Sequence, residues 1–171
     1  NIQFFFQVPY SLLNPKMKVG YAIMESIIFH NLFKTKQERT SRLHSLLDQV
    51  GLLKEHAGRY PHEFSGGQRQ RISIARALAL EPELLICDES VAALDVSVQS
   101  QVLNLLKDLK EELGLSLLFI THDMSVVNFI ADRIFVMNQG KIMESGVTQD
   151  VINSPQNDYT KRLVEAIPNW A

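Results

Sequence analysis

The chain has 171 residues, 46% of them apolar, and a formal net charge of −2 at pH 7. This length suits one domain with a hydrophobic core, and the nearly balanced charge argues against nucleic acid or an anionic membrane surface as a partner. Cys87 is the only cysteine, which excludes an intrachain disulfide and a cysteine metal cluster and fits a reducing compartment. No apolar run reaches the length needed to span a bilayer.

The first half of the chain predicts one strand followed by helices. The opening run IQFFFQ at residues 2–7 is typical of a buried strand, and a buried strand so close to Asn1 indicates that a preceding segment has been removed. Helices are predicted over 19–34 and 37–50. Ser65 is a good N-cap for a third helix that runs to about residue 80. Together these helices predict a helical insertion.

The second half alternates between strands and helices. Short apolar runs predict strands over 84–88, 115–121 and 133–137, and helical periodicity predicts helices over 98–113 and 125–131. The NQG at 138–140 predicts a hairpin turn into KIMES. Strands that alternate with helices predict an α/β fold with a mostly parallel sheet flanked by helices.

Two adjacent carboxylates, Asp88 and Glu89, follow the apolar run LLIC directly. In open α/β sheets, ligands bind beyond the carboxyl ends of the strands, so a buried strand would deliver both side chains to a site. One carboxylate can hold Mg²⁺, usually through water, and the other can polarise an attacking water. The alternative is a charged pair at a strand end exposed to solvent.

The SGGQ of residues 65–68 begins a predicted helix. A helix N-terminus offers N–H groups and a positive dipole end to an anionic phosphate, and Gly66 and Gly67 allow the phosphate to approach the backbone closely. Ser65 and Gln68 complete this candidate phosphate site. The alternative is an ordinary glycine-bearing turn into a helix.

Three further polar residues are candidates on account of their position. Gln7 ends the first strand and can reach Mg²⁺ or its waters through its amide oxygen. His122 follows the strand LLFIT and can bond a γ-phosphate or hold a nearby carboxylate, although a lone histidine there is more often structural. Asp95, just before a helix, is most simply an N-cap.

The order of these pieces resembles that of the ATP-binding subunit of an ABC transporter. The matching residues are Gln7 (Q-loop), 64–68 (signature), 84–88 (Walker B), Glu89 (catalytic glutamate), Asp95 (D-loop) and His122 (H-loop). The flanks FQVPYSLLNP, ALDVSVQSQVLNLL and SPQNDYTKRLVEAIP are similar to the branch that imports dipeptides, oligopeptides and nickel. The resemblance implies a P-loop NTPase-like fold, with a helical signature subdomain at about 16–80, a RecA-like core at 1–15 and 81–150, and a C-terminal tail at 151–171.

By this resemblance, two such subunits, identical or different, sandwich two ATP molecules with Mg²⁺, and the signature of one faces the nucleotide of the other. Glu89 and His122 are then catalytic, Gln7 and Asp88 hold the metal, and 65–68 with Asp95 contact nucleotide. Hydrolysis drives transmembrane permease subunits that a solute-binding protein supplies. The resemblance places the subunit in the cytoplasm, on the inner face of the cell membrane.

The chain departs from the family pattern in several places. No GxxxxGK[ST] sequence occurs in the 171 residues, so the Walker A loop, which holds the β- and γ-phosphates, is expected upstream of Asn1. Val8, Ser90 and Ala92 replace an acidic residue, a proline and a serine that are usual in the family. A degenerate, non-catalytic partner and a soluble ABC ATPase that acts on DNA or ribosomes are therefore the alternatives. The transported solute stays open among dipeptide, oligopeptide and nickel.

Overall fold

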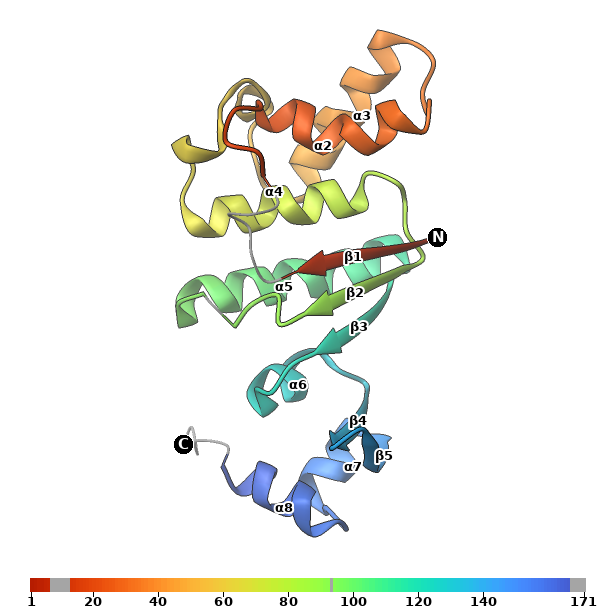
Figure 1. Ribbon diagram of the computed structural model, residues 1–171, viewed down its shortest axis with the longest axis vertical. Coiled ribbons are helices and arrows are strands. Elements are labelled where there is room, and N and C mark those ends of the chain that lie inside the picture. Colours follow the sequence, from red (N-terminus) through yellow and green to blue (C-terminus); the bar gives the residue numbers. More distant parts are fainter. Residues whose placement is uncertain (7–12, 93, 167–171) are drawn as a thin grey trace. The chain divides into compact units, whose positions relative to one another are not determined.

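The computed structural model describes residues 1–6, 13–92 and 94–166. These residues form two compact units, Asn1–Ile120 and Thr121–Ala171 (Figure 1). The boundary between the units falls inside the stretch 81–150 that the resemblance assigns to a RecA-like core. The proposed subdomain bounds at 16–80 and 151–171 therefore stay a prediction.

The first unit is built on a parallel sheet of three strands in the order β1 (Ile2–Phe6), β2 (Leu84–Asp88) and β3 (Ser116–Ile120). Phe6 lies opposite Asp88, and Asp88 lies opposite Ile120, so the three strands end at the same level. The parallel sheet confirms the predicted α/β fold class. It also brings the carboxyl ends of three distant segments to one edge, where ligands bind in folds of this kind.

Helices precede β2 and join β2 to β3. Their bounds are α2 (Val19–Phe29), α3 (Lys36–Gln49), η1 (Lys54–Gly58), η2 (Pro61–Glu63), α4 (Gly66–Leu78) and α5 (Val96–Leu113). Helix α2 ends at Phe29 rather than at residue 34, since Asn31 and Phe33 take positive φ angles of 53° and 58°. Helix α4 packs on β1 and contacts both α2 and α5, so it links the sheet to the helical layer (Figure 1).

The predicted buried strand at the start of the chain is buried on one face only. Phe5 is 1% exposed, whereas Ile2 and Phe4 are each 55% exposed. Successive side chains of a strand point to opposite faces, so an apolar run does not by itself make both faces buried. The strand predicted at 2–7 is confirmed over Ile2–Phe6, with one of its faces buried at Phe5.

The second unit contains a β-hairpin and three short helices. Their bounds are α6 (Met124–Ile130), β4 (Arg133–Asn138), β5 (Lys141–Val147), α7 (Thr148–Asn153) and α8 (Asp158–Glu165). The hairpin predicted at 138–140 is confirmed: Gln139 and Gly140 have φ angles of 48° and 75°, as the tight two-residue turn requires. Among the described residues, the predicted strand at 133–137 pairs only with β5, and antiparallel, as a hairpin requires.

A small core holds the second unit together. Ile134 and Val136 on β4 and Val151 on α7 are buried, and Tyr159 and Leu163 of α8 pack against them. Glu144 on β5 fixes the segment before α8, because its carboxylate accepts backbone N–H groups of Gln156 at 2.9 Å and Asn157 at 3.1 Å. These hydrogen bonds, led by the one from Gln156, lower the pKa of Glu144. Over the described residues, no helix is both long and apolar enough to cross a membrane.

Candidate nucleotide site

The carboxylate pair lies at the carboxyl edge of the parallel sheet. Asp88 is the last residue of β2 and is half-buried, whereas Glu89 leaves the strand with a φ angle of 44°. A residue other than glycine in this left-handed region costs about 1–3 kcal/mol, and such residues cluster at functional sites. Because β2 ends at Asp88, the alternation of a strand does not set the direction of Glu89.

Backbone hydrogen bonds hold Glu89 in this strained conformation. Its N–H donates to the carbonyl of Ile120 at the end of β3 at 2.9 Å, and its carbonyl accepts from the N–H of Ala92 at 3.1 Å. The first bond extends the pairing of β2 with β3 by one residue. The turn that carries the candidate catalytic glutamate is thus attached to the neighbouring strand.

Gln70 is a residue of this region that the sequence prediction missed. Its side chain is fully buried, and its Nε2 donates to the backbone carbonyl of Ser90, 20 residues further along the chain. This bond ties α4, which begins with the SGGQ segment, to the turn directly after Glu89. A signal was present in the sequence: Gln70 shares the helical spacing of the buried Ser73, Ile74 and Ala77.

The face of β2 that carries Leu85 and Cys87, next to Asp88 and Glu89, is fully buried. Cys87 is fully buried, and burial raises the pKa of its thiol from 9.0 to about 12, with a smaller opposing effect from a hydrogen bond with Ser90. A thiol in such surroundings stays protonated and unreactive at neutral pH. Cys87 therefore belongs to the packing beneath Asp88 rather than to any chemical step.

The SGGQ segment begins α4 as predicted. Ser65 is the N-cap, and its hydroxyl accepts from the N–H of Gln68 at 3.3 Å while the Gln68 Oε1 accepts from the N–H of Ser65 at 3.1 Å. The space around Gly66 is open, whereas a Cβ at Gly67 would meet Val98 of α5 at 2.8 Å. Gly66 thus leaves the helix end accessible, and Gly67 permits close packing of α4 on α5.

Asp95 lies next to this helix end. It is the N-cap of α5, and its Oδ1 accepts from the N–H of Val98, the residue that contacts Gly67, at 3.0 Å. The structure therefore brings Ser65–Gln68 and Asp95 together, and it confirms the N-cap interpretation of Asp95. It also connects this group through α4 to Ser90 and Glu89.

Two candidates remain, His122 and Gln7. His122 is exposed and belongs to the second unit, two residues after the end of β3 in the chain. Gln7 falls outside the residues that the structure describes. The described residues thus bring together Asp88 and Glu89 at one place, and Ser65–Gln68 and Asp95 at another.

The donor set at the carboxyl edge fits Mg²⁺ bound together with a nucleotide. The described residues contain no group of three or more histidine, cysteine or acidic side chains that could enclose a metal. Mg²⁺ does not need such a cage, since it keeps several waters and binds to one or two carboxylates plus substrate phosphates. Asp88, half-buried at a strand end, is a carboxylate of this kind.

Comparisons with known proteins identify relatives of the chain. A family model described as ABC transporter matches residues 1–92. The oligopeptide transport ATP-binding protein OppF of Bacillus subtilis (strain 168) is 56% identical over 167 residues, which are 98% of this chain and 55% of the relative. The glutathione import ATP-binding protein GsiA of Pectobacterium atrosepticum is 53% identical over 168 residues, 98% of this chain and 27% of the relative.

A solved structure shares the fold. CbiO1 from Clostridium perfringens, described as part of the ABC transporter complex CbiONQ, superimposes with a TM-score of 0.80 at 29% identity, over 90% of this chain and 59% of that protein. The chain spans about half the length of the OppF relative, at 55%. The family match covers more than half of the chain, and the chain belongs to the ABC transporter family.

Proposed function

We propose that this chain is the part of an ATP-binding subunit that carries the hydrolytic carboxylate and the signature segment, in an ABC importer for peptides. The observation that carries the proposal is the arrangement around Glu89: a carboxylate at the carboxyl edge of a parallel sheet, joined through Ser90 and Gln70 to the helix that SGGQ begins. The identity of 56% and 53% to proteins named for oligopeptide and glutathione import supports peptides over nickel.

In the proposed reaction, the two carboxylates have separate tasks. Glu89 accepts the proton of the water that attacks the γ-phosphate, and Asp88 holds Mg²⁺, directly or through water. When bound, Mg²⁺ neutralises charge on the phosphates. Gln7 supplies a second oxygen toward the metal, and His122 orients Glu89 and the γ-phosphate.

The signature end of the chain has a task in a dimer. The N-terminus of α4 presents N–H groups and a positive dipole end, and Gly66 has open space around it, so a phosphate can approach. Ser65–Gln68 and Asp95 would contact the nucleotide that a second ATP-binding subunit holds, identical or different. The further partners are transmembrane permease subunits and, through them, a solute-binding protein. The proposed location is the cytoplasmic face of the membrane.

The experiment joins a family P-loop segment to the amino end of the chain and measures steady-state ATPase together with ATP-dependent dimerisation by size-exclusion chromatography. Glu89→Gln keeps size and hydrogen bonding but cannot accept the proton, so turnover should be lost while ATP stays bound in a closed dimer. Asp88→Asn should weaken Mg²⁺–nucleotide binding, and His122→Ala should slow hydrolysis. Near-normal turnover of the Glu89→Gln variant would contradict the assignment.

The 171-residue chain alone is proposed to be inactive, because it contains no P-loop sequence. Isothermal titration with Mg²⁺–ATP should show no tight binding, and phosphate release should match a protein-free blank. If the P-loop fusion is equally inactive, while it binds ATP, the chain is a degenerate partner rather than a hydrolytic one. The Ser90 and Ala92 departures would then be the first positions to restore to the family residues.

A further inference from the structure

A pocket of about 330 Å³ lies at the amino-terminal edge of the sheet in the first unit. Pro82 and Glu83 precede β2, and Leu115 precedes β3, so the pocket is at the opposite end of the strands from Asp88. The five residues of β2 place about 13–16 Å between the two ends. This volume is at the small end of the range for ligand pockets.

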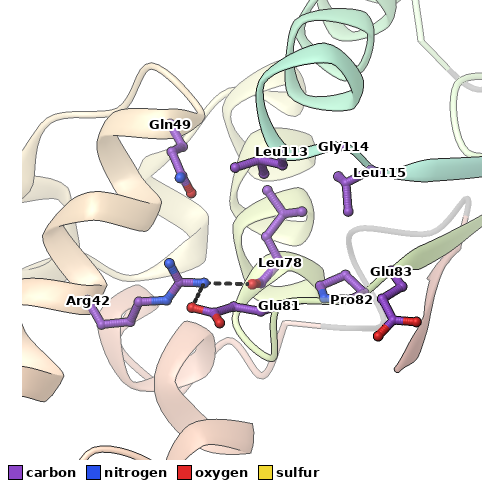
Figure 2. Close-up of a pocket in the computed structure, with 9 residues that line it drawn as sticks. All are labelled: Arg42, Gln49, Leu78, Glu81, Pro82, Glu83, Leu113, Gly114 and Leu115. Atoms are coloured by element: carbon purple, nitrogen blue, oxygen red, sulfur yellow. Dashed lines mark hydrogen bonds and ion pairs between the residues drawn. The ribbon is translucent and has the colours of Figure 1, made fainter.

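The pocket combines an apolar wall with a few polar groups, as ligand sites do. Leu78, Pro82, Leu113 and Leu115 supply the apolar wall. From α3, Arg42 reaches toward Leu78 and Glu81 (Figure 2), and Gln49 also lines the pocket. The pocket is therefore enclosed by the helical layer on one side and by the start of the sheet on the other.

Arg42 is the only cation among the described residues that line the pocket, and protein acceptors already engage it. Arg42 Nη2 donates to the carbonyl of Leu78 at 3.0 Å and lies 3.3 Å from the Glu81 carboxylate, as the dashed lines in Figure 2 show. Glu81 is 71% exposed and Glu83 is 88% exposed at the rim. The contact of Glu83 with the amino group of Asn1, at 3.8 Å, is weak and solvated.

Two helix ends add to the negative charge of the rim. Helix α4 ends at Leu78 and helix α5 ends at Leu113, and both residues line the pocket. The carboxyl end of a helix carries a partial negative charge, which favours cations. Because Arg42 compensates Glu81 and the Leu78 carbonyl, the remaining negative groups at the rim are the Glu83 carboxylate and the carboxyl end of α5.

An unused acceptor lies in the same wall. Gln49 Oε1 is buried and has no hydrogen-bond partner among the described residues. The terminal amide of a glutamine turns easily about its last side-chain bond, so a donor in the pocket can engage this oxygen after a small rotation. A group that offers N–H donors satisfies both Gln49 and the carboxylates.

We propose that this pocket binds a small organic cation, with its ammonium toward Glu81 and Gln49 and its apolar body on the leucines. The occupant touches α3 as well as the start of β2 and the turn between α5 and β3. It therefore ties the helical layer to the sheet at the edge opposite the candidate nucleotide site. This is an additional binding site and does not depend on the proposed transport function.

The experiment titrates three probes of nearly equal size into the protein: 2-phenylethylamine, 2-phenylethanol and 3-phenylpropanoate, which are a cation, a neutral molecule and an anion. Binding is followed by ligand-observed nuclear magnetic resonance and by the backbone amide of Gly114. We expect the amine to bind more tightly than the alcohol and the anion not to bind. Equal affinities of amine and alcohol, or tighter binding of the anion, would overturn the proposal.

Variants localise the effect. Glu81→Gln should weaken amine binding by roughly three- to fivefold, as expected for an ion pair near the surface, and leave alcohol binding unchanged. Gln49→Met keeps the shape of the side chain but removes the acceptor, and it should weaken the amine as well. Glu55→Gln, an equal charge change at an exposed position of η1, is the matched control. If Glu55→Gln weakens the amine as much as Glu81→Gln does, the amine responds to overall charge and the site is refuted.

Discussion

The two faces of the three-stranded sheet have similar residues and different surroundings. On one face, Phe5, Leu85 and Cys87 are at most 1% exposed. On the other face, Phe4 is 55% exposed, Leu118 46% and Ile120 50%. Hydrophobicity alone does not distinguish these faces, because each carries mostly apolar side chains, with Gln3 on the covered face and Asp88 and Ser116 on the open face. What distinguishes them is contact with other elements, such as that of α4 with β1.

The largest expected effect on stability comes from a substitution on the covered face. It tests whether side chains on the two faces contribute differently to the free energy of unfolding. Leu85→Ala should lower the free energy of unfolding by about 2–5 kcal/mol, since it leaves a cavity on the covered face. Leu118→Ala on the open face removes the same atoms and should cost about 1 kcal/mol or less. Denaturation in urea, followed by circular dichroism, measures both. Equal losses would mean that the open face is covered in solution.

The second prediction concerns the hydrogen bond from Gln70 of α4 to the backbone carbonyl of Ser90. Gln70→Met keeps the volume but removes the donor to the Ser90 carbonyl, and it should cost about 1–3 kcal/mol of unfolding free energy. Gln101→Met on the exposed side of α5 is the control and should change stability by less than about 0.5 kcal/mol. A Gln70→Met variant as stable as its control would show that the Ser90 carbonyl finds another donor.

The third prediction uses the pH dependence of the covered face. The pKa of Cys87 is about 12 in the fold and 9.0 as its ordinary value, because burial disfavours the thiolate. The folded state therefore keeps the proton longer, and the contribution is fully present below pH 9 and is lost as the pH rises toward 12. At pH 10 the loss should be about 1 kcal/mol.

Urea denaturation at pH 8 and pH 10 measures this loss, and the Cys87→Ala variant is the control. Between pH 8 and pH 10, the free energy of unfolding should fall less in the variant than in the parent protein, and the difference is the contribution of the thiol. An identical slope in both proteins would contradict the burial of Cys87. Slow alkylation of the native protein at pH 8, compared with the urea-unfolded chain, provides a second measure.

The smallest expected effect on stability belongs to the open face. Leu118→Lys should change the free energy of unfolding by about 0.5 kcal/mol or less, but it should reduce the binding of a hydrophobic dye and the tendency to aggregate. Gln101→Lys adds the same charge on α5 and should leave dye binding unchanged. A loss of dye fluorescence in both variants would assign the effect to net charge instead.

Much of this arrangement could be predicted from the sequence, because local signals decide it. Alternating strands and helices predicted the parallel sheet, Ser65 and Asp95 were correct helix caps, and NQG was a correct hairpin turn. The missed features depend on distant contacts. Periodicity does not tell which face of β1 is covered.

In the candidate site, too, some features could be predicted from the sequence and others could not. Asp88 and Glu89 were found from their place after an apolar run, since the end of a strand is visible in sequence. Gln70 was not found, because its helical spacing indicates only that it is buried, and its partner is a backbone carbonyl 20 residues away that has no signature in the sequence. The positive φ of Glu89 was equally hidden, since glutamate gives no hint of a left-handed conformation.

The hydrogen bond from Gln70 to Ser90 has a mechanical consequence. Because Gln70 lies in the second turn of a helix, the first turn with Ser65–Gln68 cannot shift along its axis without pulling on Ser90 or breaking that bond. Ser90 is the next residue after Glu89, and the N–H of Glu89 is hydrogen-bonded to the carbonyl at the end of β3. The first turn of α4 and one amide group thus connect the glycine segment to the turn that carries Glu89.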